Sequence, residues 1–317
     1  VEPNDIRGSI LPALCTFRAK FDYDPVDREG NRIEVPAKLR EMEATSEMCK
    51  LVHMYYFGHV VNAGKGSPNG GIYFDFHRFT DEQIDEMFEA VMDHFDGFYK
   101  HGFYHGESIT DLRDLAKKNR RVEVGLTSEY SVGGIFIDEN MYTGVPGLYA
   151  AGEAASGVFG ANRVADAVTE MLVQGYKAGE EAAKYASKSA CCAPDTAAID
   201  SAVSVIEKML SNEGGISTPE AMHKLGEISD HALGMVRNEK SLRAGVEDFE
   251  KLGRELDTIT LKSKSLNYNR ELMQALAARN LTDCSRVAAK MALARKESRG
   301  LHLRDDYSFI DNENWQV

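Results

Sequence analysis

One segment constrains the fold of this 317-residue chain more than any other, residues 147–186, which begin "GLYAAGEAASGVFGANR". A short apolar run is followed by a glycine turn, the acidic Glu153, a second glycine turn and a long helical pattern. Glycine lets a backbone approach a ligand closely, and a helix that begins near Ala161 points unpaired N–H groups and its positive dipole end at that position. The segment therefore predicts a strand, a turn and a helix suited to an anionic ligand. An ordinary strand–turn–helix with glycine for tight packing has the same shape.

The chain before this segment mixes strands and helices. "DREGNRIEV" (27–35) predicts a hairpin with Gly30 at its tip, and residues 37–63 carry a helical pattern. "IYFDF" alternates as a strand does, and Thr80 is expected to cap the acid-rich helix that follows. Residues 120–153 contain three short apolar runs, "RVEVGL", "GGIFID" and "GLYAAGE", which predict strands.

The chain after this segment is predicted to be helical. The helix that begins near Ala161 is expected to bury the apolar side chains of Val164, Val168, Met171, Leu172 and Ala178. Apolar residues then recur at three- and four-residue intervals, which predicts a bundle with helices near 196–211, 219–235, 239–258, 267–279 and 282–298. The composition changes abruptly near 187–196, where we place a domain boundary.

Charge and cysteine content exclude several classes of protein. The net charge of −13 leaves no basic stripe for a nucleic acid, although a few local arginines could hold a small anion. No apolar run reaches the roughly 18 residues of a transmembrane helix. The five cysteines form no CxxC pair, which favours reduced thiols in the cytoplasm and argues against an iron–sulfur cluster in this chain. No metal ligands are expected.

Three motifs in a fixed order give the chain a specific resemblance. They are "GKGSPNGGIYFDF" (64–76), a glycine pair followed by "TGVPGLYAAGE" and "GANR" (133–163), and "RKESRGLHLRDDYSFIDNENW" (295–315). In this order they resemble the flavoproteins of the fumarate reductase, succinate dehydrogenase and L-aspartate oxidase family. The resemblance implies FAD as the cofactor.

The resemblance also implies the architecture. The expected fold class is α/β, with an incomplete FAD-binding Rossmann-like domain, part of a capping domain and a C-terminal helical bundle. Residues 1–60 would be a partial capping or substrate domain, 61–190 the C-terminal part of the FAD-binding domain and 191–317 the helical domain. The GxGxxG that holds the FAD pyrophosphate is absent from the sequence. We therefore expect an N-terminal FAD-binding half in the same or another chain.

The same resemblance implies roles for individual residues. Glu153 would contact the adenosine ribose, and the turn and helix start that follow would lie along the isoalloxazine ring. Arg163 would bind a substrate carboxylate through its bidentate donor fork, since a cation in a first helical turn opposes the helix dipole and needs a partner. The cofactor contacts would come from Gly152, Glu153, Ala154, Gly160, Ala161, Asn162 and Val168.

The departures from the family pattern concern the substrate. Glu129 stands where family members usually have a substrate-binding His, and a carboxylate repels a dicarboxylate. Residues 164–169 read "VADAVT", so the usual Asn and Ser contacts are not carried over. Between residues 38 and 60 there is no Arg-Asp pair for proton donation; Lys50, His53 and His59 are the substitutes there. The catalytic candidates are thus Arg163 and Glu129.

Taken with these departures, the resemblance implies part of an FAD-dependent oxidoreductase subunit that moves electrons or hydride between FAD and a carboxylate-bearing substrate. Such subunits commonly work with an iron–sulfur partner, and a cytoplasmic chain would reach a membrane only through partner subunits. One alternative is a flavoenzyme of the family with a different substrate, such as a bulkier acid, a thiol-coupled donor or a sulfur compound. Another is a non-catalytic assembly subunit. The "ESRG" strap with His302 and Arg304 is expected to be structural, with an ion-pair network of Glu297, Arg299 and Asp305.

Overall fold

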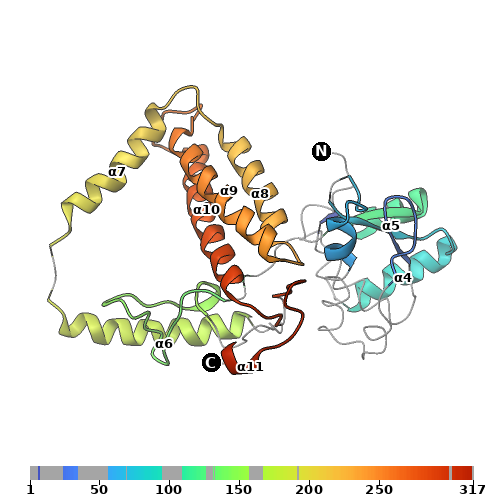
Figure 1. The fold of residues 1–317 in the computed structure, drawn as a ribbon, viewed down its shortest axis with the longest axis horizontal. Coiled ribbons are helices and arrows are strands. Elements are labelled where there is room, and N and C mark those ends of the chain that lie inside the picture. Colours follow the sequence, from blue (N-terminus) through green and yellow to red (C-terminus); the bar gives the residue numbers. More distant parts are fainter. Residues whose placement is uncertain are drawn as a thin grey trace. The chain divides into compact units, whose positions relative to one another are not determined.

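The computed structural model divides the chain into two compact units, residues 1–131 and 132–317. It describes residues 6–7, 24–34, 56–68, 70–94, 109–125, 131, 133–156, 167–190, 193–299 and 302–315 (Figure 1). Of the helix predicted for residues 37–63, only the end is described, as a π-helical turn at Tyr56–Val61; residues 37–55, with Lys50 and His53, lie outside these ranges.

The first unit contains a mixed four-stranded sheet in the order β1-β4-β3-β2. β1 (Ile6–Arg7) runs parallel to β4 (Arg121–Gly125), and β3 (Ile72–Asp75) is antiparallel to both β4 and β2 (Asp24–Val26). The predicted alternation of β3 is confirmed, since its side chains alternate between buried and half-buried. The predicted hairpin is confirmed as well, because Gly30 has a φ of 88° in the turn after β2.

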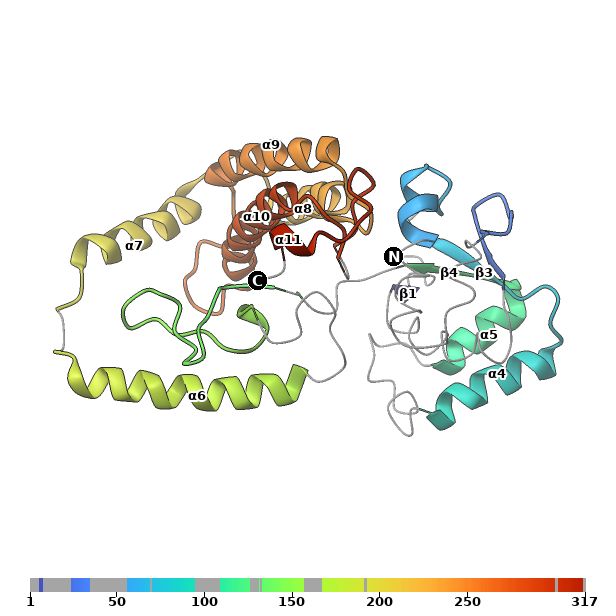
Figure 2. The same ribbon diagram turned by 60° about the horizontal axis from the view of Figure 1, so that its bottom comes forward.

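Two helices cover one face of this sheet (Figure 2). α4 (Asp81–His94) begins with the predicted cap, because the Thr80 hydroxyl accepts from the Gln83 N–H at 3.3 Å and the Thr80 N–H donates to the Gln83 side chain at 2.9 Å. α5 (Ile109–Asn119) leads directly into β4, and the π-helical turn η1 (Tyr56–Val61) precedes β3. The core between the helices and the sheet is apolar: Ile72, Phe74, Phe76, Ile84, Met87, Phe88, Ala116 and Val122.

The second unit begins with a looped segment, residues 133–156, and the long helix α6 (Ala167–Lys188). The two apolar runs predicted as strands here are present only as isolated bridges among the described residues, Ile135 with Ala155 and Tyr142 with Tyr149. Each run pairs with a neighbour at one residue and then turns away, so neither extends into a ladder.

The rest of the second unit is the predicted helical domain. α7 (Thr196–Ser211) is followed by α8 (Thr218–Leu233), α9 (Glu239–Glu255) with the short 3-10 turn η3 (Leu256–Thr258), and α10 (Arg270–Ala294). α8, α9 and α10 lie side by side in both views (Figures 1 and 2). Their shared core includes Leu225, Phe249, Leu252, Leu256, Ile259, Leu272, Ala275, Ala278 and Ala289.

The prediction of two helices at 267–279 and 282–298 is wrong, because α10 is continuous. The polar stretch around Thr282 suggests a break, as a threonine often caps a new helix. In the structure the Thr282 hydroxyl instead donates to the Ala278 carbonyl of the preceding turn at 2.7 Å, with only 2% of the residue exposed. No Gly or Pro interrupts the helix.

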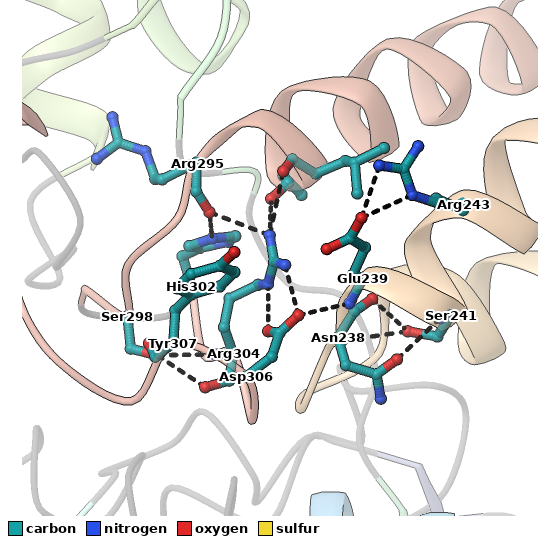
Figure 3. A network of polar contacts seen from close by, with 12 residues as sticks. Asn238, Glu239, Ser241, Arg243, Arg295, Ser298, His302, Arg304, Asp306 and Tyr307 are labelled. Atoms are coloured by element: carbon teal, nitrogen blue, oxygen red, sulfur yellow. Dashed lines mark hydrogen bonds and ion pairs between the residues drawn. The ribbon is translucent and has the colours of Figure 1, made fainter.

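A strap of residues 295–315, ending in the short helix α11 (Asn312–Trp315), ties the end of α10 to the connection between α8 and α9. Figure 3 shows Arg304 at its centre, with only 1% exposed. Its guanidinium donates to the carbonyls of Ala292, Leu293 and Arg295 at 2.9, 3.2 and 3.1 Å. These are among the carbonyls that a helix end leaves unpaired. Arg304 also pairs with Asp306 through two bonds of 2.8 and 2.7 Å, so it caps α10 as a neutralised cation.

A buried carboxylate, Glu297, also stabilises the strap. Glu297 is fully buried and pairs with Arg299 through two bonds of 2.9 Å and with Arg295 at 2.5 Å. It also accepts from the Asp311 N–H at 2.8 Å, and these partners, Arg299 foremost, lower the pKa of Glu297 to about 2. The predicted pairing of Glu297 with Arg299 is confirmed. Asp305 is exposed and bonds through its N–H to the Arg237 carbonyl, so the second carboxylate of the strap is Asp306.

His302 completes the strap as a neutral side chain. Its Nδ1 accepts from Arg237 at 3.2 Å. Its Nε2 lies 3.4 Å from the Arg295 carbonyl (Figure 3). Burial and the nearby Arg237 lower the pKa of His302 to about 4. The strap is therefore held by ion pairs and backbone bonds, as a structural element would be.

Candidate functional site

The candidate site is centred on a tight turn, the 3-10 helix η2 (Gly152–Ala154). The Ala155 N–H donates to the Gly152 carbonyl at 2.9 Å and closes the turn. Gly152 is buried with a φ of 69°, and a Cβ there would lie 3.0 Å from the Met171 Cβ of α6. Position 152 thus requires glycine for two reasons, the positive φ of the backbone and the close packing of α6. Glu153 and Ala154 are exposed at the outer side of the turn.

The glycine pair of residues 133–134 lies against this turn. The Ile135 N–H donates to the Ala154 carbonyl at 2.9 Å, and the Ser156 N–H donates to the Ile135 carbonyl at 2.8 Å. A Cβ on Gly134 would lie 2.5 Å from the Ala154 carbonyl oxygen, so only glycine allows these two segments to meet. Gly133, at a φ of 100°, has no neighbour within 4 Å of its missing Cβ among the described residues. The described part of the motif therefore forms one structure, in which no described residue fills the space beside Gly133.

Two residues of α6 that stabilise the turn, Gln174 and Glu170, were not predicted from the sequence. The Gln174 side chain of α6 accepts the Gly152 N–H at 2.7 Å and donates to Glu170 at 3.0 Å. Glu170 and Gln174 are 7% and 5% exposed. The signal was present in the sequence, because Glu170 and Gln174 lie four positions apart among the apolar residues at the start of the helix and therefore share one face.

The prediction of an apolar buried face on this helix is wrong at three of the four described positions, while the fourth, Ala178, is half-buried. Val168, Met171 and Leu172 are 61%, 49% and 66% exposed, and the buried side chains of the first turns are Glu170 and Gln174. The amide and carboxylate face the turn because the Gly152 N–H needs a buried acceptor. Val164 lies outside the described residues.

The "VPGLY" part of the motif supports the turn from the other side. The Asp138 carboxylate accepts from the N–H groups of Asn140 and Tyr142 at 2.8 and 2.9 Å and forms a loop. The rings of Tyr142 and Tyr149 lie 5.8 Å apart. These contacts bring the chain back to Ala150, directly before the turn, whose N–H donates to the Met141 carbonyl at 3.1 Å.

The structure describes only part of the predicted site. It places Gly152, Glu153 and Ala154 together in one turn, and it places Val168 on the exposed side of α6. The remaining predicted residues lie outside the described part of the chain: Glu129, Gly160, Ala161, Asn162 and Arg163. Their roles stay predictions. Within the described ranges, no group of three His, Cys, Asp or Glu side chains could hold a metal ion.

The described residues fit a nucleotide cofactor. The exposed turn combines an acidic side chain with small neighbours, and the space beside Gly133 leaves the backbone open to close approach. A carboxylate is the usual acceptor for ribose hydroxyls in dinucleotide-binding sites. Glu153, held by a rigid turn, is suited to that contact.

Comparison with protein families identifies both parts of the chain. Residues 27–166 match the model described as "FAD binding domain", and residues 222–317 match the model described as "Fumarate reductase flavoprotein C-term". The first match confirms FAD as the cofactor. The two matches together confirm the predicted fold class, part of an FAD-binding domain followed by a helical domain.

Individual relatives agree with these matches. The fumarate reductase (CoM/CoB) of Methanothermobacter marburgensis has a subunit that is 29% identical over 248 residues, covering 77% of this chain and 42% of the relative. The fumarate reductase flavoprotein subunit of Haemophilus influenzae is 32% identical over 202 residues, covering 62% of this chain and 34% of the relative. The structure of Mycobacterium smegmatis Sdh1 in complex with UQ1 matches with a TM-score of 0.73 at 26% identity, covering 93% of this chain and 47% of that one.

This chain spans between a third and a half of the length of these relatives. Its two family matches follow each other in the order that the sequence motifs predicted. The chain therefore belongs to the fumarate reductase and succinate dehydrogenase family of flavoproteins.

Proposed function

We propose that this chain is part of an FAD-dependent oxidoreductase subunit that moves electrons or hydride between FAD and a carboxylate-bearing substrate. The observation that carries the proposal is the Gly152–Ala154 turn, which combines the family motif with a geometry open to a nucleotide and lies inside the FAD-binding match. FAD supplies the redox chemistry when it is bound. The residues of this chain bind and orient the cofactor and the substrate.

On the cofactor side, Glu153 accepts hydrogen bonds from the adenosine ribose, and Ala154 lets the turn lie close to the cofactor. Gly160, Ala161 and Asn162 continue this contact toward the ring, and Val168 adds an apolar contact from α6. The exposed apolar side chains of the second unit support the need for a covering partner: Ile135, Phe136, Val168, Leu172, Val173 and Tyr176. We assign that role to an N-terminal GxGxxG-bearing half, in the same or another chain.

On the substrate side, Arg163 binds a carboxylate through two parallel N–H bonds. Glu129 sets which acid is accepted, because its negative charge disfavours a second carboxylate nearby unless it is protonated or paired. The partners of the subunit would include an iron–sulfur protein. None of the described helices has the length and apolar character needed to cross a bilayer. Contact with a membrane would be made through partner subunits of a cytoplasmic assembly.

The visible spectrum of the purified flavoprotein, in the assembly in which it is expressed, tests the proposal directly. The bands of an oxidised flavin, bleached by a reductant and restored by an added acceptor acid, are the expected result. A flavin-free assembly would refute the enzymatic role and leave the alternative of a non-catalytic assembly subunit. An Arg163→Ala variant that binds FAD normally but turns over substrate at the wild-type rate would refute the role of Arg163.

A specific observation favours a second candidate within the family, a substrate other than fumarate or succinate. Glu129 replaces the usual His, and one relative carries the name fumarate reductase (CoM/CoB). Steady-state rates with fumarate, with a bulkier unsaturated acid and with thiol donors distinguish the candidates. A Glu129→His variant should increase activity with fumarate if Glu129 is the residue that excludes it.

A further inference from the structure

A buried relay links the candidate cofactor turn to the body of α6. The relay runs from the Gly152 N–H to the Gln174 carboxamide and from there to the Glu170 carboxylate, over distances of 2.7 and 3.0 Å. The two side chains are 5% and 7% exposed, so little water is available to replace either partner. A buried hydrogen-bonding group that loses its partner costs far more than an exposed one.

The chemistry of the two ends specifies the residue between them. A backbone N–H can only donate, so the carboxamide oxygen of Gln174 must face Gly152. The carboxylate of Glu170 accepts, so the carboxamide nitrogen must face Glu170. Only a side chain with one acceptor and one donor at this reach satisfies both ends. A glutamate at position 174 would place two carboxylates side by side, and an apolar residue would leave the Gly152 N–H unpaired.

The relay acts on the most constrained part of the turn. Gly152 has a φ of 69°, its missing Cβ lies 3.0 Å from the Met171 Cβ, and its carbonyl closes the turn by accepting from Ala155. Once the N–H of Gly152 is fixed, the next residue, Glu153, leaves the turn in one direction. The relay therefore determines where the exposed carboxylate of Glu153 is held.

We propose that Gln174 is a positioning residue for FAD binding, which fixes the Gly152–Ala154 turn through its paired bonds to the Gly152 N–H and Glu170. The inference rests on the proposed function, because the turn is assigned there to the cofactor. Gln174 has no contact with FAD in this proposal. Its effect reaches the cofactor through the turn alone.

A swap of the two polar side chains tests the relay in the full flavoprotein. In Gln174→Glu the two carboxylates repel each other, so the dissociation constant for FAD is expected to rise about tenfold or more. In the double variant Glu170→Gln/Gln174→Glu the new carboxylate still accepts from Gly152, and the new amide at 170 donates to it. This variant is expected to bind FAD within about threefold of wild type, although it carries one more substitution.

Three further measurements make each outcome decisive. Gln174→Met keeps the length of the side chain and leaves Gly152 unpaired without adding a charge, so weaker FAD binding is expected even if Gln174→Glu does not fold. Glu180→Gln, at an exposed polar position of the same helix that has no contact with the turn, is the matched control and should bind FAD as wild type does. Far-ultraviolet circular dichroism confirms that the compared variants are folded.

The inference is overturned if Gln174→Met binds FAD like wild type, or if the double variant binds FAD no more tightly than Gln174→Glu. If the two side chains acted only through general packing, the effects of the two substitutions on FAD binding would add. FAD binding that is restored in the double variant therefore indicates that the paired bonds position the turn. A wild-type flavoprotein that binds no FAD would instead refute the proposed function. The two failures are therefore distinguishable.

Discussion

Replacing the buried Glu297 with glutamine should weaken the strap of residues 295–315 by an amount that depends on pH. The carboxylate is fully buried, and its partners are Arg299, Arg295 and the Asp311 N–H. Together they lower the pKa of Glu297 from an ordinary value of 4.5 to about 2. A shift of this size corresponds to roughly 3 kcal/mol of folding free energy at neutral pH, at about 1.4 kcal/mol for each pKa unit.

The sign follows from the direction of the shift. A carboxyl with a lowered pKa in the folded state binds its proton more weakly there than in the unfolded state. The stabilisation by Glu297 is therefore complete above pH 4.5 and is lost as the pH falls through about 2. Glu297→Gln should accordingly lose about 3 kcal/mol of unfolding free energy at pH 7, and clearly less near pH 3.

Urea denaturation of the flavoprotein at pH 7 and pH 3, followed by circular dichroism, measures this difference. Asp305→Asn is the matched control, because Asp305 is an exposed carboxylate of the same strap and its removal should cost less than about 0.5 kcal/mol. A Glu297→Gln variant as stable as wild type at pH 7 would refute the reasoning. So would a deficit of the same size at both pH values.

Three other predictions follow from the described contacts. The stabilisation that depends on neutral His302 should fall by up to about 3 kcal/mol as the pH drops from 6.5 to about 4, because the histidine binds its proton more weakly in the folded state. An NMR titration of the His302 ring and urea denaturation of the His302→Gln variant measure this. Arg304→Lys should lose about 2 kcal/mol or more despite keeping its charge, because one ammonium cannot cap the α10 carbonyls and pair with Asp306 at the same time; thermal unfolding measures the loss. Gly134→Ala should reduce FAD binding strongly and Gly133→Ala only mildly, because both glycines have a positive φ but, among the described residues, only Gly134 faces a backbone oxygen. Flavin fluorescence titration compares the two variants, and equal effects on FAD binding would contradict the steric argument.

The sequence predicted the fold class through the family resemblance, and it predicted individual elements through local signals. The capping of α4 by Thr80, the turn at Gly30 and the alternation of β3 each depend on a few neighbouring residues, and each is confirmed. The same holds for the Glu297–Arg299 pair, which is two residues apart in the chain. Local chemistry of this kind is readable without knowledge of the fold.

The predictions that failed depended on contacts between distant residues. A break between residues 279 and 282 was expected, but packing against α8 and α9 makes the continuous α10 favourable, and the Thr282 hydroxyl bonds back into its own helix. The exposed Val168 and Leu172 were expected to be buried because their spacing marks an apolar face. The spacing correctly places these apolar side chains on one face of α6. Only the tertiary structure decides whether another part of the chain packs against that face.

The candidate site shows the same division. The sequence by itself determined the family motif and, through the resemblance that three motifs in a fixed order carry, FAD as the cofactor. Only the tertiary structure decided that Gly134 must contact the Ala154 carbonyl and that Gln174 and Glu170 hold Gly152 from behind. The physical reason is that a buried N–H must find an acceptor, and its acceptor, Gln174, lies 22 residues further along the chain, brought close by the packing of α6 on the turn.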